Sequence, residues 1–497
     1  MDRASGLRLP SALDDLSDRV PSLSDKAMNI TRRQLLAGAA ALAATPAPAA
    51  LSARAPASTR KFPEGFLWGA STASYQIEGS LDVDGRGPDI WDAFTRAGRI
   101  MDGSTAQVAC DHYNRYAEDV ALMKAAGFNA YRFSLAWPRI IPAGSGAVNA
   151  KGLDFYDRLV DALLAAGIQP MACLYHWDMP QPLHDQGGWQ ERAMIGPFAE
   201  YARVAVRRLG DRVKNWVMLN EPNVVAIFGY GVGEHAPGLR LGETGILRAL
   251  HHQNLAQGAA LRAARAERAD AVLGTVTNLS PCVPDTGSEA DRRAAILWDA
   301  VWNRVTLDGL FKGEIPAVLA DRMADLVQPG DLELARFPID MLGVNYYSRN
   351  TMRHDPTRAF NAGWGDPKVT RRTGLGWPIQ PEGLYEQLMD IKDNYGNPAC
   401  YIAENGAVYD DVAGPDGHVR DAERSRFIRE HIEQIHRALT DGANVRGYLA
   451  WSLLDNFEWA FGLSKRFGII RVDFDTLKRT PKDSYYLMQR IARENAI

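Results

Sequence analysis

The chain has 497 residues, of which 46% are hydrophobic and 23% are charged, an ordinary balance for a globular protein with a large core. Its formal net charge is only −4 and the sequence has no long basic block, so a nucleic-acid partner is not expected. The four cysteines lie far apart without metal-ligand spacing, so the sequence predicts neither a disulfide framework nor a zinc site.

The first 60 residues differ in composition from the rest of the chain. Arg32 and Arg33 precede an apolar stretch from Leu35 to Ala44, and an Ala-x-Ala follows at residues 47–49. This order is typical of an export leader of the twin-arginine type, and the apolar stretch is too short to span a bilayer. A disordered Ala/Pro-rich tail is the alternative interpretation.

The leader predicts where the protein works. Export would place the mature chain in the periplasm or outside the cell, with no stable membrane association once the leader is removed, and a cytoplasmic location is the alternative. Residues 1–27 contain five aspartates, which is unusual ahead of an export signal, so the expected true start is Met28.

From Lys61 onward, short apolar runs alternate with amphipathic stretches of helical period. Two of the helical stretches end at Gly127 and Gly167, and glycine is common just past a helix C-terminus. Eight such repeats predict an α/β fold, a (β/α)8 TIM barrel that forms a single domain over residues 61–497, with an open doubly wound sheet as the alternative. The runs begin at Phe66, Ala130, Gln169, Asn215, Val272, Asp340, Cys400 and Val445.

The carboxyl ends of these predicted strands carry an unusual set of side chains. In a (β/α)8 barrel they all meet at one mouth, where the chemistry takes place. Here the set mixes hydrogen-bonding groups with flat indole rings, and sugars bind to that mixture because their hydroxyls need donors and acceptors while their C–H faces stack on tryptophan. The set comprises Gln76, Trp137, His176, Trp177, Asp178, Asn220, Glu221, Asn278, Asn345, Tyr347, Glu404 and Trp451.

Two of these residues are glutamates at the ends of apolar runs. Glu221 follows NWVMLN and precedes Pro222, which cannot donate to a continuing strand, and Glu404 follows CYIA. Paired carboxylates flank the scissile bond in glycoside hydrolysis, and enzymes that retain configuration hold them about 5 to 5.5 Å apart. We expect one carboxylate to be ionised and the other to be kept protonated by its neighbour's charge.

Several motifs in order resemble glycoside hydrolase family 1, the β-glucosidase family, from about Phe62 to the C-terminus. They are FLWGASTASYQIEG, YRFSLAWPRI, LYHWDMPQPL, LNEP, HAPG, GVNYY, GWPIQPEGL, IAENG and WSLLDNFEWAFGLSKRFG. The resemblance implies that Glu221 is the acid/base and Glu404 the nucleophile. It also implies a cis peptide bond between Trp451 and Ser452.

The same resemblance implies the remaining site residues. Trp451 would be the platform under the sugar, and Arg132 and Asn345 would support the nucleophile together with Tyr347. The other implied substrate-binding residues are Gln76, His176, Trp177, Asn220, Glu458, Trp459 and Phe467.

The function implied is hydrolysis of terminal non-reducing β-D-glucosyl and related residues, from a small-molecule β-glycoside or an oligosaccharide, by double displacement with retention, with no metal ion and no organic cofactor. A transglycosylating enzyme and a sugar-binding protein without turnover are the alternatives. Lys465 and Arg466 could indicate a phosphorylated sugar, but a negative charge on Glu458 would repel that phosphate, which favours unphosphorylated substrates.

One departure from the family pattern concerns the strand that carries Glu404. The family usually has threonine where this chain has Ala403. Because successive side chains of a strand point to opposite faces, we expect Ala403 to point into the layer between barrel and helices, where it alters packing and not chemistry.

Overall fold

The structure is a computed structural model that describes residues 60–497. The leader predicted for residues 1–60 therefore lies outside the described residues except for Arg60. The backbone N–H of Arg60 donates to Ile497 O and the N–H of Ile497 donates to Arg60 O, both at 3.0 Å. Arg60 is thus already tied to the folded body.

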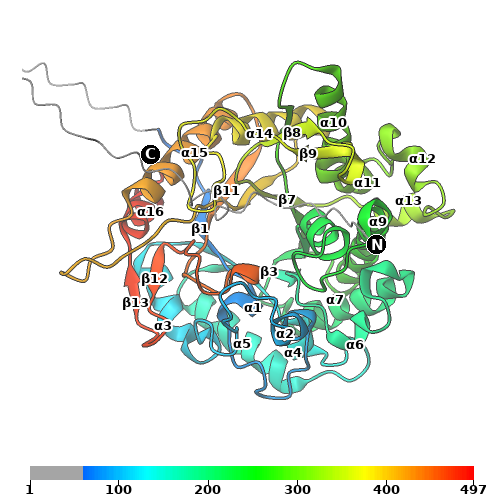
Figure 1. Cartoon of the computed structure of the whole chain (residues 1–497). Coiled ribbons are helices and arrows are strands. Elements are labelled where there is room, and N and C mark those ends of the chain that lie inside the picture. Colours follow the sequence, from blue (N-terminus) through cyan, green and yellow to red (C-terminus); the bar gives the residue numbers. More distant parts are fainter. Residues whose placement is uncertain (1–59) are drawn as a thin grey trace, which may run out of the picture.

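Eight parallel strands close into a barrel, as the sequence predicts (Figure 1). Around the barrel their order is β1, β11, β10, β7, β5, β4, β3, β2, and β2 pairs with β1 again. Each predicted apolar run contains one of these strands, so the open-sheet alternative is wrong. They are β1 (Leu67–Ser71), β2 (Ala130–Ser134), β3 (Gln169–Tyr175), β4 (Asn215–Asn220), β5 (Val272–Asn278), β7 (Met341–Asn345), β10 (Cys400–Glu404) and β11 (Val445–Trp451).

Helices surround the barrel as an outer ring (Figure 1). Gly127 and Gly167 follow the ends of two of them with φ of 74° and 77°, a left-handed conformation that glycine adopts without strain. The long helices are α3 (His112–Ala125), α5 (Ala150–Ala165), α7 (Ile195–Leu209), α9 (Gly242–Glu267), α10 (Glu289–Asp299), α14 (Glu382–Asn394), α15 (Ala422–Thr440) and α16 (Asp483–Glu494). Within residues 60–497, no helix combines the length and apolarity needed to cross a membrane.

Shorter elements decorate the loops. The short helices are α1 (Ser74–Ile77), α2 (Ile90–Arg96), α4 (Trp137–Ile140), α6 (Gln181–His184), α8 (Pro222–Val224), α11 (Val305–Phe311), α12 (Ala320–Met323) and α13 (Asp331–Ala335). A three-stranded sheet is formed by β6 (Cys282–Pro284), β8 (Asn350–His354) and β9 (Ala362–Trp364), and a two-stranded one by β12 (Ile470–Val472) and β13 (Arg479–Pro481).

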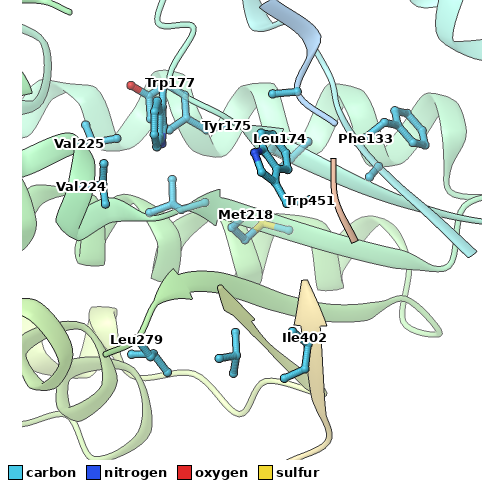
Figure 2. Packing of buried hydrophobic residues seen from close by; sticks show 14 of the residues in the cluster. Phe133, Leu174, Tyr175, Trp177, Met218, Val224, Val225, Leu279, Ile402 and Trp451 are labelled. Atoms are coloured by element: carbon cyan, nitrogen blue, oxygen red, sulfur yellow. The ribbon is translucent and has the colours of Figure 1, made fainter. Parts of the chain in front are cut away.

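The core has two shells separated by the strands. The outer shell packs strand residues such as Phe133, Leu174 and Met218 against surrounding elements (Figure 2). The inner shell fills the barrel and draws its buried members from strands alone. These are Ala130, Met171, Cys173, Val217, Val276, Met341, Ala403 and Leu449. The floor below the mouth is therefore packed with apolar side chains, as in other barrels of this size.

Ala403 lies in this inner shell, so its predicted orientation toward the helices is wrong. The pairing of β10 with β7 shifts register between Ile402 and Glu404, and such a bulge interrupts the alternation of side chains. The pairing of β4 with β5 shifts likewise between Val217 and Asn220. Both strands that carry a predicted catalytic glutamate are thus irregular just before it, which re-aims the side chain at the strand end.

Substituting Leu449 tests the inner shell. Leu449→Ala removes a fully buried side chain in the barrel and should lower the free energy of unfolding by about 2–5 kcal/mol. Leu164→Ala on α5 is the matched control, because Leu164 is 41% exposed and its loss should cost no more than about 0.5 kcal/mol. Urea unfolding midpoints check both, and equal shifts would contradict a packed barrel interior.

Candidate active site

The predicted site residues meet at the carboxyl end of the barrel. Most lie at or just after a strand: Arg132 on β2, His176 and Trp177 after β3, Asn220 and Glu221 at the end of β4, Asn345 and Tyr347 at the end of β7, Glu404 on β10 and Trp451 on β11. Gln76 comes from α1, and Glu458, Trp459 and Phe467 come from the loop after β11. Glu221 and Glu404 are both buried, with 4% and 2% of their surface exposed.

Glu404 is held by a cation and a phenol. Arg132 Nη1 donates to Glu404 Oε1 at 2.6 Å, and the hydroxyl of Tyr347 donates to Oε2 at 2.7 Å. Burial raises the pKa of Glu404, and the charge and hydrogen bond of Arg132 are the main effects that oppose the rise. Both oxygens thus receive donors that stabilise an ionised carboxylate.

Glu221 has neutral partners only. Its Oε1 accepts from Asn345 Nδ2 at 2.8 Å and from Asn278 Nδ2 at 3.0 Å. Burial, followed by the nearby charge of Glu404, raises the pKa of Glu221 to about 8. At neutral pH Glu221 is therefore mainly protonated, whereas the donors on both oxygens of Glu404 favour its ionised form.

Three site residues have left-handed backbone conformations. The φ angles are 49° at Glu221, 80° at Trp177 and 47° at Trp459. Such angles are uncommon for residues with a side chain and cluster at functional sites, where the surrounding structure imposes them. At Glu221 the turn ends β4 and starts α8.

Asn220 links the carboxylate pair to His176. Its Oδ1 accepts from Arg132 Nη2 at 2.6 Å and from Asn345 Nδ2 at 3.1 Å, which turns its own Nδ2 toward His176 Nε2 at 2.9 Å. His176 Nε2 must then be the acceptor, so the ring proton lies on Nδ1. Burial and the charge of Arg132 lower the pKa of His176 well below its usual range, which keeps the imidazole neutral.

Buried polar atoms without partners point into the same region. His176 Nδ1 and Gln76 Oε1 have no hydrogen-bond partner among residues 60–497, although both are buried. Gln76 Nε2 donates to Glu458 Oε2 at 3.2 Å, and burial, together with the charge of Glu404, raises the pKa of Glu458 to about 8. Because native proteins rarely leave buried polar atoms unpaired, these atoms fit a polar ligand.

Aromatic rings enclose the polar groups. His176 stacks on Trp451 with ring centroids 5.7 Å apart and on Trp459 at the same distance. Trp177 lies 4.6 Å from Trp459, and its Nε1 donates to Asn220 O at 3.0 Å. Figure 2 shows Trp177 and Trp451 above the β4 residue Met218. Beside Glu404, the ring of Phe467 lies against the ring of Tyr347, with ring centroids 6.1 Å apart.

Two backbone features lie at the ends of β10 and β11. The Trp451–Ser452 peptide bond is cis, as the resemblance implies. Gly406 lies so close to β11 that a Cβ there would sit 1.7 Å from Trp451 O, so only glycine fits. A side chain at residue 406 would therefore push the loop after β10 away from the end of β11.

Comparison with known proteins agrees with this geometry. The model of glycosyl hydrolase family 1 matches residues 58–497. The chain belongs to this family. Beta-glucosidase A of Acetivibrio thermocellus is 43% identical over 442 residues, which cover 87% of this chain and 98% of that protein.

Solved structures of family 1 have the same fold. A family 1 β-glucosidase from Thermotoga maritima is 43% identical with a TM-score of 0.85, and the match covers 88% of this chain and 99% of that one. The β-glucosidase from Thermotoga maritima in complex with castanospermine is 44% identical with a TM-score of 0.84, and the match again covers 88% and 99%.

Arg466 and Lys465, the two cations that could have bound a phosphorylated sugar, make contacts within the protein. Arg466 Nη1 donates to Asp455 Oδ2 at 2.7 Å and to Val472 O at 2.8 Å. Lys465 Nζ lies 5.9 Å from the ring centre of Phe461. Arg466 is thus engaged within the loop after β11.

One residue that contacts the glutamate pair has no role in the sequence-based site. The sequence predicts that Asn278 lies at the end of a strand, but no sequence pattern links Asn278 to Glu221. The signal that could have found it is its position at the end of β5, because β5 is the strand paired with β4.

Proposed function

We propose that this family 1 protein is a retaining β-glucosidase that hydrolyses terminal non-reducing β-D-glucosyl and related residues. The observation that carries the proposal is the unequal surroundings of two buried carboxyl groups, of which Glu404 faces a cation and Glu221 faces neutral amides. A protein that only bound sugars would have no use for this division. Relatives named β-glucosidase, including one in complex with castanospermine, support the choice of substrate class.

The reaction is a double displacement. Glu404 attacks the anomeric carbon, the bond from that carbon to the leaving oxygen breaks, and Glu221 gives its proton to this oxygen. Glu221, now ionised, takes a proton from water, which attacks the anomeric carbon and releases Glu404, so that the β configuration is retained. Each step uses only carboxyl groups and water, so no metal ion or organic cofactor takes part.

The remaining site residues would bind the sugar. Trp451 offers its indole face to the ring, and Arg132 and Asn345 hold the two carboxyl groups in place. The buried unpaired atoms of Gln76 and His176 support their assignment to hydroxyl groups. The further proposed substrate contacts are Trp177, Asn220, Tyr347, Glu458, Trp459 and Phe467. Engagement of Arg466 by Asp455 supports an unphosphorylated substrate.

The assignment of Glu221 as the acid predicts a pH profile. A general acid must be protonated, and a pKa of about 8 means that kcat/KM of the wild type on an aryl β-glucoside should fall as the pH rises through about 8. In Glu221→Ala this fall of kcat/KM above pH 8 should disappear. Hydrolysis of substrates with poor leaving groups should also slow far more than hydrolysis of activated phenyl glucosides, whose leaving oxygen needs little protonation. Steady-state kinetics with a leaving-group series test this. Equal damage to good and poor leaving groups would contradict the assignment.

The assignment of Glu404 as the nucleophile predicts chemical rescue. Glu404→Gly should abolish turnover, and added azide or formate should restore part of it by occupying the vacated position, with inversion at the anomeric carbon. NMR of the product formed from an activated aryl β-glucoside checks the configuration. Glu221→Ala serves as the control, because Glu404 is intact there and any product should keep the β configuration. A product of retained β configuration from Glu404→Gly would contradict the nucleophile role.

We also propose that residues before Arg60 act as a twin-arginine leader, that translation starts at Met28, and that the mature enzyme is periplasmic or secreted. A variant that lacks residues 1–59 keeps the pairing of Arg60 with Ile497 and should retain full activity. A reporter fused to residues 28–59 should leave the cytoplasm, whereas the same fusion with Arg32→Lys and Arg33→Lys should not. Loss of folding in the truncated enzyme, or a cytoplasmic reporter, would overturn this proposal.

A further inference from the structure

Asn278 and Asn345 both bind one oxygen of the acid/base. Their Nδ2 atoms donate to Glu221 Oε1 at 3.0 Å and 2.8 Å. Glu221 is buried, with only 4% of its surface exposed, and its Oε2 has no hydrogen-bond partner among residues 60–497. The two oxygens of this carboxyl group are thus unequal before any substrate enters.

This inequality has a chemical consequence. An amide N–H can only donate, and the carbonyl oxygen of a neutral carboxyl group accepts more strongly than its protonated oxygen, so two such donors favour the proton on the other oxygen. The hydrogen bonds therefore favour the proton of the neutral acid on Oε2, the oxygen that is free to reach the leaving group. We propose that Asn278 is a positioning residue for the acid/base, which fixes the transferable proton on Glu221 Oε2.

Asn278 is itself held rigidly. Its carbonyl accepts from Asn223 Nδ2 at 2.9 Å, and the same Nδ2 donates to Trp302 O at 2.9 Å. Trp302 lies in a π-helical turn, residues Ala300–Arg304, whose altered hydrogen bonding is typical of functional sites. Asn223 is fully buried and lies two residues after Glu221. Its side-chain amide therefore connects the segment that carries Glu221 to the backbone of Asn278.

A second clamp acts on the chain just past Asn278. Asn303, in the same π-helical turn, accepts from the backbone N–H of Ser280 at 3.1 Å and donates from Nδ2 to Ser280 O at 2.8 Å. The end of β5 is therefore fixed on both sides of Asn278. An amide held in this way can impose a preference on the carboxyl group that it contacts.

Asn278 is also the more selective of the two donors. Asn345 Nδ2 is shared between Glu221 and Asn220, whereas Asn278 Nδ2 donates only to Glu221 among residues 60–497. Removing Asn278 should therefore change Glu221 and leave the contacts of Asn220 in place.

Several charged groups surround Glu221 besides these amides. Glu404 on β10 opposes its ionisation, and Arg132 on β2 favours it. Glu458 after β11 and Tyr347 after β7 are also close enough to interact electrostatically with Glu221. The two amides favour the ionised form, so the loss of one should raise the pKa of Glu221.

The inference rests on the proposed β-glucosidase function, and a single set of kinetic measurements tests both. In Asn278→Ala the pH at which kcat/KM falls on the basic side should rise by about one unit, because a hydrogen bond to the ionised form of Glu221 is lost. Substrates with poor leaving groups should lose about tenfold more kcat/KM than an activated dinitrophenyl glucoside, because part of the protons now lie on the wrong oxygen. A general loss of structure would not separate the two substrates.

Two further variants make the test decisive. Asn278→Leu keeps the side-chain volume without the donor and should reproduce both effects even if Asn278→Ala folds poorly. Ser280→Ala removes a hydroxyl that donates to Asn278 Oδ1 at 3.5 Å, leaves the amide donor in place, and should move neither readout. If the wild type hydrolyses aryl β-glucosides but the donor-free variants keep its basic limb and its leaving-group dependence, the inference is wrong. If the wild type hydrolyses no β-glycoside, the proposed function itself fails.

Discussion

The site depends on two carboxyl groups that are buried beside one guanidinium. Two ionised glutamates away from water would repel each other and lose their hydration, so a single cation can stabilise only one of them. Arg132 bonds to Glu404 and turns its other nitrogen to Asn220, not to Glu221. The position of this one arginine side chain therefore distinguishes the proposed nucleophile Glu404 from the proposed acid Glu221, and the neutral amides around Glu221 agree with that assignment.

The closed barrel makes this arrangement possible. Arg132, Glu221 and Glu404 come from β2, β4 and β10, strands that are not neighbours but whose carboxyl ends meet over the same apolar floor. The register shifts next to both glutamates turn each carboxyl group to its place. Apolar packing below and indoles around them leave both carboxyl groups buried, and burial strengthens the hydrogen bonds that they accept.

The fold and most of the candidate site can be predicted from the sequence for a physical reason. Strands buried on both faces appear as continuous apolar runs, and polar residues at their ends mark where the sheet stops, so the strand ends can be found before the structure. The direction of Ala403 could not be found, because a bulge leaves no mark in the pattern of apolar residues. The link from Asn278 to Glu221 and the engagement of Arg466 by Asp455 were also out of reach, since both depend on which polar group of a distant element comes within a few ångströms.

The loop after β11 is held by a network of buried charges. Asp455 accepts from Lys482 Nζ at 2.7 Å as well as from Arg466, and Lys482 also bonds to Asp411, which pairs with Arg424 on α15. This network connects the loop after β10, which contains Asp411, to the loop that carries Glu458 and Trp459. Each buried charge has an opposite partner, and displacing one would leave another uncompensated, so the network admits one arrangement of both loops. The groups proposed to bind sugar hydroxyls are thus aligned with the nucleophile before a substrate arrives, which removes the cost of ordering them during the reaction.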